Sequence, residues 1–237
     1  MPVIVLQARL DSSRLPEKAL LPLGKKPLLF RVMEALNAIP AFLRILACPE
    51  DSAGAFAPLA AEAGFELLTG PKDDVLGRYC IAIERFGIKH IIRATGDNPF
   101  VFADAAAAIN AEALALGACY AGYSGLPIGA GIESVSAAAL LRAGSETTAS
   151  YDREHVCPYL YTHQELFLLH RPLAPLRWQG PGLRLTVDTR EDYDRAQALF
   201  SALDKQEAAG FSGGDRYRGA SIIQTYRTIF PDSGEST

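Results

Sequence analysis

The sequence predicts an α/β fold of the Rossmann-like, three-layer kind, in which helices cover both faces of a mainly parallel sheet. Two observations predict it: short apolar segments alternate with segments of helical periodicity through the first half, and polar loops directly follow the apolar segments. Parallel strands joined by crossover helices end at one common edge of the sheet. Ligands of such sheets bind beyond that carboxyl edge, so we expect the functional residues there.

The elements of the first half are marked by short apolar runs and by residues typical of helix ends. We expect strands at 3–8, 44–48, 65–68 and 90–94, and helices at 27–38, 51–63, 73–86 and 103–116. Asp51 or Ser52 could cap the second helix and an aspartate the third, while Gly64, Gly87 and Gly117 follow the last three helices. This order of elements requires a sheet with helices on both faces.

The second half is less regular, and its elements are predicted one by one. We expect a strand or hairpin arm at 128–136, a helix at 151–164, an extended segment at 166–170, a strand at 183–187, and helices at 191–203 and 221–230. The residues after 230 are expected to be disordered. The simplest organisation is a single domain of residues 1–237, with a substrate or dimerisation region at about 120–182 inserted in it.

Composition excludes several classes of protein. The 237 residues contain 23 Lys and Arg against 27 Asp and Glu, a net charge of −4, which disfavours broad nucleic-acid binding. The four cysteines form no CxxC pair, so neither a zinc ribbon nor a disulfide scaffold is indicated. The N-terminus lacks the features of a signal peptide, and no apolar run reaches membrane-spanning length. We therefore expect a soluble cytoplasmic protein with free thiols.

A cationic loop follows the first predicted strand. The stretch QARLDSSRLPEK, residues 7–18, carries Arg9, Arg14 and Lys18 in a chain that is acidic overall. Neither GxGxxG nor GxxxxGK[ST] occurs, which disfavours a dinucleotide oxidoreductase and a P-loop kinase. Guanidinium groups suit phosphate oxygens, and an ammonium supplies a point charge. Taken alone, however, three cations in twelve residues are typical of a solvated surface loop.

Two aspartates favour a binding site over a solvated surface loop. Asp97 follows the strand at 90–94 and Asp188 follows the strand at 183–187, so both are expected at the same edge as the loop. Each could simply cap a helix, as Asp188, followed by Thr189, could for the helix that begins near 191. Together, opposite the cations, they indicate a site where Mg²⁺ joins two carboxylates to the oxygens of a triphosphate.

The chain resembles the sugar cytidylyltransferases in five ordered blocks. Residues 7–29 resemble the N-terminal signature of the group of spore-coat polysaccharide biosynthesis protein F, and more distantly that of the 3-deoxy-manno-octulosonate and acylneuraminate cytidylyltransferases. Similar blocks follow: DDVLGRY at 73–79, RATGDNPF at 93–100, YDREHVCPYLY at 151–161 and LRLTVDTREDY at 183–193. The resemblance spans residues 3 to about 200 and implies a nucleotidyltransferase fold of the GT-A type.

The resemblance also implies an activity and roles for particular residues. It implies a Mg²⁺-dependent enzyme that transfers CMP from CTP to an acidic sugar for surface polysaccharide biosynthesis and releases pyrophosphate. The implied catalytic residues are Arg14, Lys18, Asp97 and Asp188, and the last two are the implied metal ligands. The implied nucleotide-binding residues are Gln7, Ala8, Arg9, Ser13, Arg14, Lys18, Asp74, Arg78, Thr95 and Gly96. The implied substrate-binding residues are Glu133, Tyr151, Arg153 and His155, and a homodimer is expected.

Several of these roles have alternatives. Arg153 could bind the acceptor's carboxylate or pair with a neighbouring acid, His155 could be structural, and Trp178 could wall a sugar or pack on a neighbour. The chain also departs from the group's pattern: Asp11 and Glu17 replace glycines, and Gly131 replaces an acidic residue. A glycosyltransferase, a nucleotidyltransferase for another base or a phosphonate acceptor, and a non-catalytic relative are the rival interpretations. A glycosyltransferase would need a DxD motif, and its candidates at 73–74 and 192–194 lie at predicted helix starts.

Overall fold

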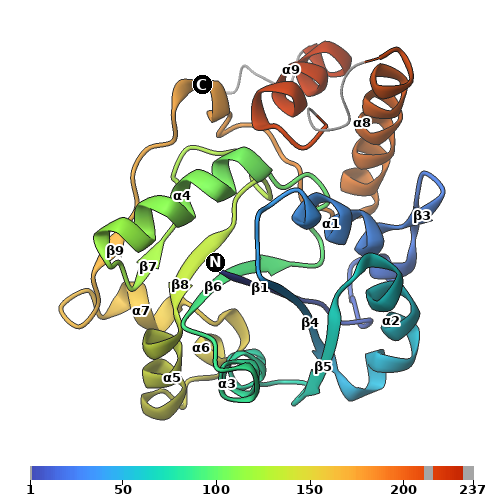
Figure 1. Cartoon of the computed structure of the whole chain (residues 1–237). Coiled ribbons are helices and arrows are strands. Elements are labelled where there is room, and N and C mark those ends of the chain that lie inside the picture. Colours follow the sequence, from blue (N-terminus) through green and yellow to red (C-terminus); the bar gives the residue numbers. More distant parts are fainter. Residues whose placement is uncertain (1, 211–215, 232–237) are drawn as a thin grey trace.

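A seven-stranded, mainly parallel sheet forms the centre of the computed structural model, which describes residues 2–210 and 216–231 (Figure 1). The strand order is β5-β4-β1-β6-β8-β7-β9. Four neighbouring strands are parallel: β5 (Glu66–Gly70), β4 (Leu43–Pro49), β1 (Val3–Gln7) and β6 (His90–Thr95). β8 (Glu133–Ser136) is antiparallel to β6 and to β7 (Tyr120–Ala121), and β9 (Leu169–His170) is parallel to β7. The predicted fold class is therefore confirmed.

Helices form a layer on each face of the sheet (Figure 1). One face carries α1 (Leu28–Asn37), α2 (Glu50–Ala63) and α4 (Ala103–Leu116), with α8 (Arg190–Ala208) and α9 (Gly219–Ile229) packed beyond them. The other face carries α3 (Val75–Phe86), α5 (Ala137–Glu146), α6 (Ser150–His155) and α7 (Pro158–Thr162). Each layer has its own apolar cluster, because side chains alternate across a strand: Ile4 and Leu6 face the first cluster, and Val3 and Val5 face the second.

The helix ends of the first half largely follow the sequence signals. α2, α3 and α4 end at Gly64, Gly87 and Gly117, as predicted. α3 begins at an aspartate, Asp74, whose side chain accepts a hydrogen bond from the Gly77 N–H at 2.8 Å. The predicted cap of α2 is wrong, because Pro49 occupies that position and no side chain caps the helix. Ser52 is instead buried in the first turn, where its hydroxyl accepts a hydrogen bond from the Leu10 N–H at 3.1 Å and tethers the cationic loop.

The single helix predicted at 151–164 is two short helices. α6 ends at His155 and α7 begins at Pro158. Between them Val156 has a φ of +74°, and the Cys157 N–H donates to the His155 carbonyl at 2.9 Å across this three-residue turn. Pro158 explains why the helix does not run on, because inside a helix it would have no N–H for the carbonyl four residues earlier and its ring would clash there, whereas the first turn of α7 tolerates it. The sequence contained that signal, and the apolar periodicity across it was misleading.

The strand predicted at 183–187 does not join the sheet. Leu183, Leu185 and Val187 are buried in the predicted alternation, but the segment makes only an isolated bridge, between Arg184 and Ile128. Its Val187 N–H donates to the Asp97 carbonyl at 2.9 Å. The alternation therefore reflects an extended segment with one buried face, not a strand paired in the sheet. This segment crosses near the carboxyl end of β6. The extended segments predicted at 128–136 and 166–170 also shorten, to β8 and β9.

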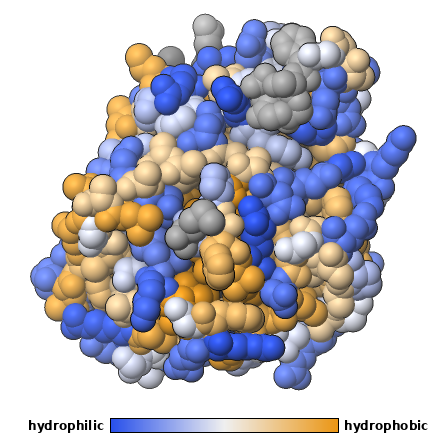
Figure 2. All heavy atoms as spheres, viewed as in Figure 1, coloured by the Kyte–Doolittle hydropathy of each residue, from blue (hydrophilic) through white to orange (hydrophobic). Residues whose placement is uncertain are grey.

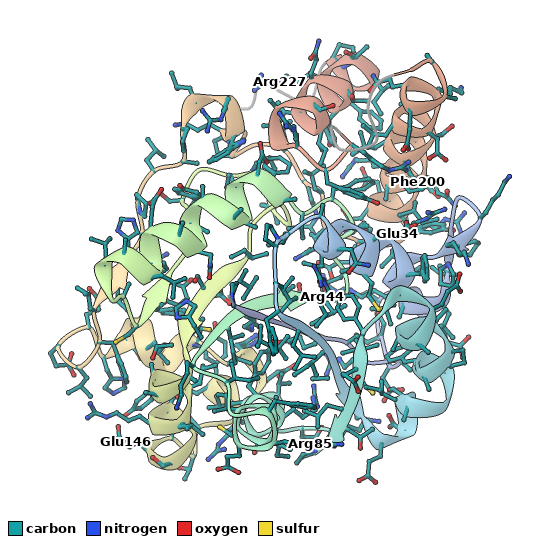
Figure 3. The ribbon with its side chains drawn as sticks, in the orientation of Figure 1. Glu34, Arg44, Arg85, Glu146, Phe200 and Arg227 are labelled. Carbon is teal, nitrogen blue, oxygen red and sulfur yellow. The ribbon has the colours of Figure 1, made fainter. Side chains whose placement is uncertain are left out.

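The C-terminal helices are fastened to the sheet domain by side-chain contacts. Figure 3 shows Phe200 of α8 near Glu34 of α1, and the Phe200 ring lies 4.4 Å and 4.2 Å from the guanidinium carbons of Arg31 and Arg216. Trp178 is buried, and its indole N–H donates to Asp104 at 2.9 Å. It therefore packs within the core and lines neither of the two polar cavities at the carboxyl edge. Disorder was expected after residue 230, and residues 232–237 lie outside the described part of the chain.

The described surface is mixed in character (Figure 2), and the cysteines are unpaired. No helix within residues 2–210 or 216–231 has the length and apolar character needed to cross a membrane. The four cysteines are free thiols, as predicted. The face shown in Figure 2 mixes hydrophilic and hydrophobic side chains, with hydrophobic ones gathered at the left over β7 and β9. Leu114, Leu116 and Leu168 are among the exposed leucines of the protein.

Candidate active site

A polar cavity of about 450 Å³ opens at the carboxyl ends of β1 and β6. This is the point where the chain reverses its direction of travel across the sheet, since β4 and β5 lie on one side of β1 and β6 lies on the other. Nine of the ten predicted nucleotide-binding residues line it: Gln7, Ala8, Arg9, Ser13, Arg14, Lys18, Arg78, Thr95 and Gly96. Asp97, Asp188 and His155 line it as well.

The floor of the cavity is set by the close approach of two strand ends. Gln7 pairs with Thr95 across β1 and β6, and the Gly96 N–H donates to the Gln7 carbonyl at 2.8 Å. A Cβ at position 96 would lie 2.8 Å from the Ala8 Cβ, which is closer than two carbon atoms approach. Glycine is therefore required at position 96, and it lets both loops leave the sheet side by side.

The ammonium of Lys18 joins the two predicted metal ligands. It donates to Asp97 Oδ2 at 3.2 Å, to Asp188 Oδ1 at 2.9 Å and to the Val187 carbonyl at 2.9 Å. Only 16% of the lysine side chain is exposed. Because both carboxylates contact one nitrogen atom, they lie close together and face the cationic loop. The structure thus brings together residues that are 79 and 170 positions apart in the chain.

Asp188 is the more strongly compensated of the two acids. Besides Lys18, its carboxylate contacts Arg14 at 3.3 Å and Arg184 at 2.9 Å. Burial by itself would raise the pKa of Asp188, but the Lys18 hydrogen bond and the three neighbouring cations outweigh it and lower this pKa. The alternative role of Asp188 as a helix cap is wrong. Thr189 caps α8 and forms a capping box with Asp192, which leaves the Asp188 carboxylate free to face the cavity.

Asp97 is oriented by its own loop. The Thr95 hydroxyl donates to Asp97 Oδ1 at 2.7 Å, and the Asn98 amide donates to Thr95 Oγ1 at 2.8 Å. The backbone carbonyl of Asp97 accepts from Val187 on the facing segment. One oxygen of the carboxylate is therefore held by its own loop, and the other is presented to the cation beside Asp188.

Ion pairs fasten the cationic loop on both sides. Arg9 lies 3.5 Å from Glu154 of α6, and both side chains are more than half exposed. Asp11, which replaces a glycine of the family pattern, pairs with Lys72, and Lys72 also binds Asp51 at 2.9 Å. The extra anion near the proposed phosphates thus has its own cation. Glu17, the other replaced glycine, adopts a left-handed backbone with a φ of 51°.

Arg78 is a buried cation in the wall of the cavity, with 2% of its surface exposed. Its Nη1 donates to the carbonyls of Pro71 and Lys72, and its Nε is buried without a hydrogen-bond partner among the described residues. Burial lowers the pKa of this guanidinium. A buried donor without a partner is costly, so the position fits an arginine that serves a ligand.

The remaining predicted residues divide between structural and cavity positions. Asp74 caps α3 and pairs with Arg153 at 3.2 Å, and neither residue lines the cavity. Arg153 also donates to the carbonyls of Thr147 and Gly144, so its guanidinium ties α6 to α5, and its predicted contact with the acceptor is not supported. Tyr151 is 63% exposed and stacks on His155 with ring centroids 4.4 Å apart. His155 lines the same cavity as the predicted nucleotide-binding residues.

Glu133 belongs to a second cavity, of about 300 Å³, which shares Arg93 and Thr95 with the first. It lies beside Arg93 in the sheet and forms an ion pair with it, and the Tyr120 hydroxyl donates to it at 2.9 Å. Burial opposes the charge on Arg93, but the attraction of Glu133 outweighs it and raises the pKa of the guanidinium. The Arg93–Glu133 pair thus forms the partition between the two cavities.

Comparison with known proteins agrees with this geometry. Residues 3–217 match the profile of a family described as cytidylyltransferase. The chain belongs to the cytidylyltransferase family. A relative with a name that describes its role is the spore coat polysaccharide biosynthesis protein SpsF of Bacillus subtilis, which is 32% identical over 206 residues, 84% of this chain and 85% of that protein.

Solved structures show the same fold at lower identity. A cytidylyltransferase from Leptospira borgpetersenii has a TM-score of 0.84 and 24% identity, covering 100% of this chain and 98% of that one. A CMP:2-keto-3-deoxy-manno-octonic acid synthetase, solved in complex with CTP, has a TM-score of 0.67 and 15% identity, covering 85% of this chain and 99% of that one. The fold of the cytidylyltransferases therefore extends over the whole described chain.

Sequence reasoning missed residues that support the site of this cytidylyltransferase. Arg184 links the carboxylates of Asp188 and Asp192, and Arg93 divides the cavities. A signal existed for Arg93, because a charge near the end of the apolar strand HIIRA needs a buried partner. The two DxD candidates of the glycosyltransferase interpretation are committed to helix starts, since Asp74 caps α3 and Asp192 completes the capping box of α8.

Proposed function

We propose that this protein transfers CMP from CTP to an acidic sugar, releases pyrophosphate, and serves surface polysaccharide biosynthesis. The observation that carries the proposal is the meeting of Lys18, Asp97 and Asp188 in a cavity that also contains Arg9, Arg14 and Arg78. Membership of the cytidylyltransferase family supports CTP as the donor. The printed role of the SpsF relative supports the pathway.

We propose Mg²⁺ as the cofactor, held by Asp97 and Asp188. The donor set fits, because the two carboxylates already converge on one cation, the Lys18 ammonium. No group of three or more His, Cys, Asp or Glu side chains that could hold a metal occurs in the described part of the chain. A site of two carboxylates suits Mg²⁺, which binds through one or two carboxylates and completes its shell with phosphate oxygens and water. When bound, the ion would draw negative charge from the α-phosphate.

The chain's own cations account for the rest of the chemistry. An acceptor oxygen bonds to the α-phosphorus, the bond to the bridging oxygen breaks, and pyrophosphate leaves with the electron pair while the hydroxyl proton passes to water. Arg14 and Lys18 lie where they can bind the departing phosphates, and a triphosphate would offer Lys18 oxygens in exchange for the two carboxylates. Catalysis then depends mainly on positioning and on neutralising charge.

Pyrophosphate release tests the proposed function. The purified protein is incubated with Mg²⁺, CTP and a panel of acidic sugars, with UTP and GTP as controls for the base. We expect release with CTP and at least one acidic sugar, and little with UTP or GTP. Transfer of the sugar from a nucleoside diphosphate-sugar donor, with release of the nucleoside diphosphate, would favour a glycosyltransferase instead. An absence of CTP binding by calorimetry would refute the proposed function itself.

We also propose that the enzyme is a cytoplasmic homodimer. The free thiols are compatible with a reducing compartment. Leu116 and Leu168 are 55% and 56% exposed, and the Leu168 carbonyl accepts from the Cys119 N–H next to the edge strand β9. An apolar surface beside a sheet edge is typical of an interface. Light scattering after size exclusion should give twice the chain mass, and Leu168→Glu should shift it towards the monomer.

A further inference from the structure

The second cavity lies next to the nucleotide cavity and has no assigned ligand. It has a volume of about 300 Å³ and shares Arg93 and Thr95 with the nucleotide cavity. Its far wall comes from the segments that follow β7 and precede β8, and from Arg171 after β9. Glycines at 122, 129 and 131 line it, so a ligand can approach the backbone closely there. A molecule in this cavity would be adjacent to a nucleotide in the first.

One charge in this second cavity has no counter-ion. Arg93 and Glu133 neutralise each other, and Glu133 also accepts a hydrogen bond from Tyr120. Arg171 is exposed, and among the described residues it has no hydrogen bond or ion pair; its guanidinium carbon lies 5.8 Å from the centroid of the Tyr161 ring. The cavity thus presents a single uncompensated guanidinium, which matches the single charge and the planar fork of a carboxylate.

A second polar group in the wall also lacks a partner. Asn98 lines the cavity, and its Oδ1 is buried without a hydrogen-bond donor in the described residues. The amide cannot simply turn over, because its Nδ2 donates to Thr95 Oγ1, which in turn donates to Asp97. A buried acceptor without a donor needs an O–H or N–H from elsewhere. Its position one residue after Asp97 places that missing donor close to the proposed site of phosphoryl attack.

We propose that this cavity is the acceptor subsite, that Arg171 binds the acceptor's carboxylate, and that Asn98 accepts a hydrogen bond from one of its hydroxyl groups. The inference rests on the proposed cytidylyl transfer and names its acceptor class as a small hydroxylated carboxylic acid. A phosphonate or phosphate monoester would bring up to two negative charges against one free cation, beside Glu133, so the carboxylate is the better match. Arg171 replaces Arg153 as the residue expected to recognise the carboxylate.

The test compares Arg171→Met and Arg171→Lys with a control, Arg85→Met. Arg85 is an exposed arginine of α3 that lines neither cavity, and Figure 3 shows it at the opposite end of the view from α9. Steady-state pyrophosphate release is measured with CTP, Mg²⁺ and a panel containing 3-deoxy-manno-octulosonate, N-acetylneuraminate, glucuronate and a phosphonate. Binding of CTP to each variant is measured separately by calorimetry.

We expect Arg171→Met to raise the acceptor KM by about 10- to 100-fold, with the Kd for CTP unchanged and Arg171→Lys intermediate. Asn98→Ala should lower kcat/KM for the acceptor by about 10-fold at constant CTP affinity. An acceptor KM in Arg171→Met equal to that of Arg85→Met would overturn the assignment, and so would turnover with the phosphonate alone. If the wild type binds CTP but uses no carboxylic acid of the panel, the acceptor class is wrong. If it does not bind CTP, the proposed function fails first.

Discussion

Replacing Asp192 with asparagine should destabilise the protein by an amount that depends on pH. Asp192 is the third residue of α8, and 3% of its side chain is exposed. Its carboxylate accepts the backbone N–H groups of Asp188 and Thr189, both at 3.0 Å, and two donors of Arg184, at 2.8 and 3.2 Å. Asp192 therefore holds the turn that presents Asp188 to Lys18.

The magnitude follows from the pKa of this carboxyl. Burial by itself would raise the pKa of Asp192, but the hydrogen bonds from Arg184 and from the two backbone N–H groups lower it from 3.8 to about 2. At about 1.4 kcal/mol for each pKa unit, the difference corresponds to about 2–3 kcal/mol of stability at neutral pH. Because the folded-state pKa is the lower one, this contribution is complete above the unfolded-state pKa and disappears as the pH falls towards 2.

Urea unfolding at pH 7 and pH 3 measures the effect. The difference in free energy of unfolding between wild type and Asp192→Asn should be about 2 kcal/mol at pH 7 and should shrink by about 1 kcal/mol at pH 3. Asp194→Asn is the matched control, since Asp194 is 59% exposed and pairs only with Arg190 among the contacts that the structure describes. A difference that is the same at both pH values would refute the pKa argument.

The site and the cationic loop yield further predictions. Asp97→Asn should abolish turnover, a loss of at least about 10³-fold in kcat, with an unchanged melting temperature; normal kcat would remove Asp97 from the metal site. Lys18→Met should raise the Mn²⁺ affinity of the nucleotide-free protein by about 10-fold in an electron paramagnetic resonance titration, because a competing cation leaves the two carboxylates. The exposed Lys25→Met serves as its control, and equal affinities in both variants would contradict the fit of the site. Glu17→Gly should stabilise the protein by about 0.5–1 kcal/mol in urea, since it relieves a left-handed φ, whereas Glu17→Ala should not; a loss of stability in the glycine variant would count against that strain.

The first half of the chain was predictable because its signals are local. β1, β4, β5 and β6 are short apolar runs that end in polar loops, and α2, α3 and α4 end at glycines. Parallel strands with crossover helices leave few possible arrangements, so the common edge of Gln7 and Thr95 followed from the order of elements. Apolar runs and helical periodicity were enough to predict these elements, because each segment packs against its neighbours in the expected way.

Residue type was a poor guide where long-range contacts decide the structure. Residues 183–187 alternate as a strand does, yet they lie across the end of β6 and pair at a single bridge. The sequence left open whether Arg153 binds an acceptor carboxylate or pairs with a neighbouring acid, and in the structure its guanidinium contacts Asp74 and two carbonyls. Neither outcome can be read from residue type, because each depends on which surfaces meet after folding.

By itself the amino-acid sequence determined the four neighbouring parallel strands, their carboxyl edge, and the kinds of charged side chain gathered there. Those properties depend on the order of apolar segments and on loops that directly follow them, which are local features of the chain. Only the tertiary structure decided that Lys18 bridges Asp97 and Asp188, that Thr189 and not Asp188 caps α8, and that Arg171 and Asn98 face a common cavity. The physical reason is that hydrogen bonds and ion pairs between distant residues depend on positions within a few ångströms, which sequence periodicity does not specify.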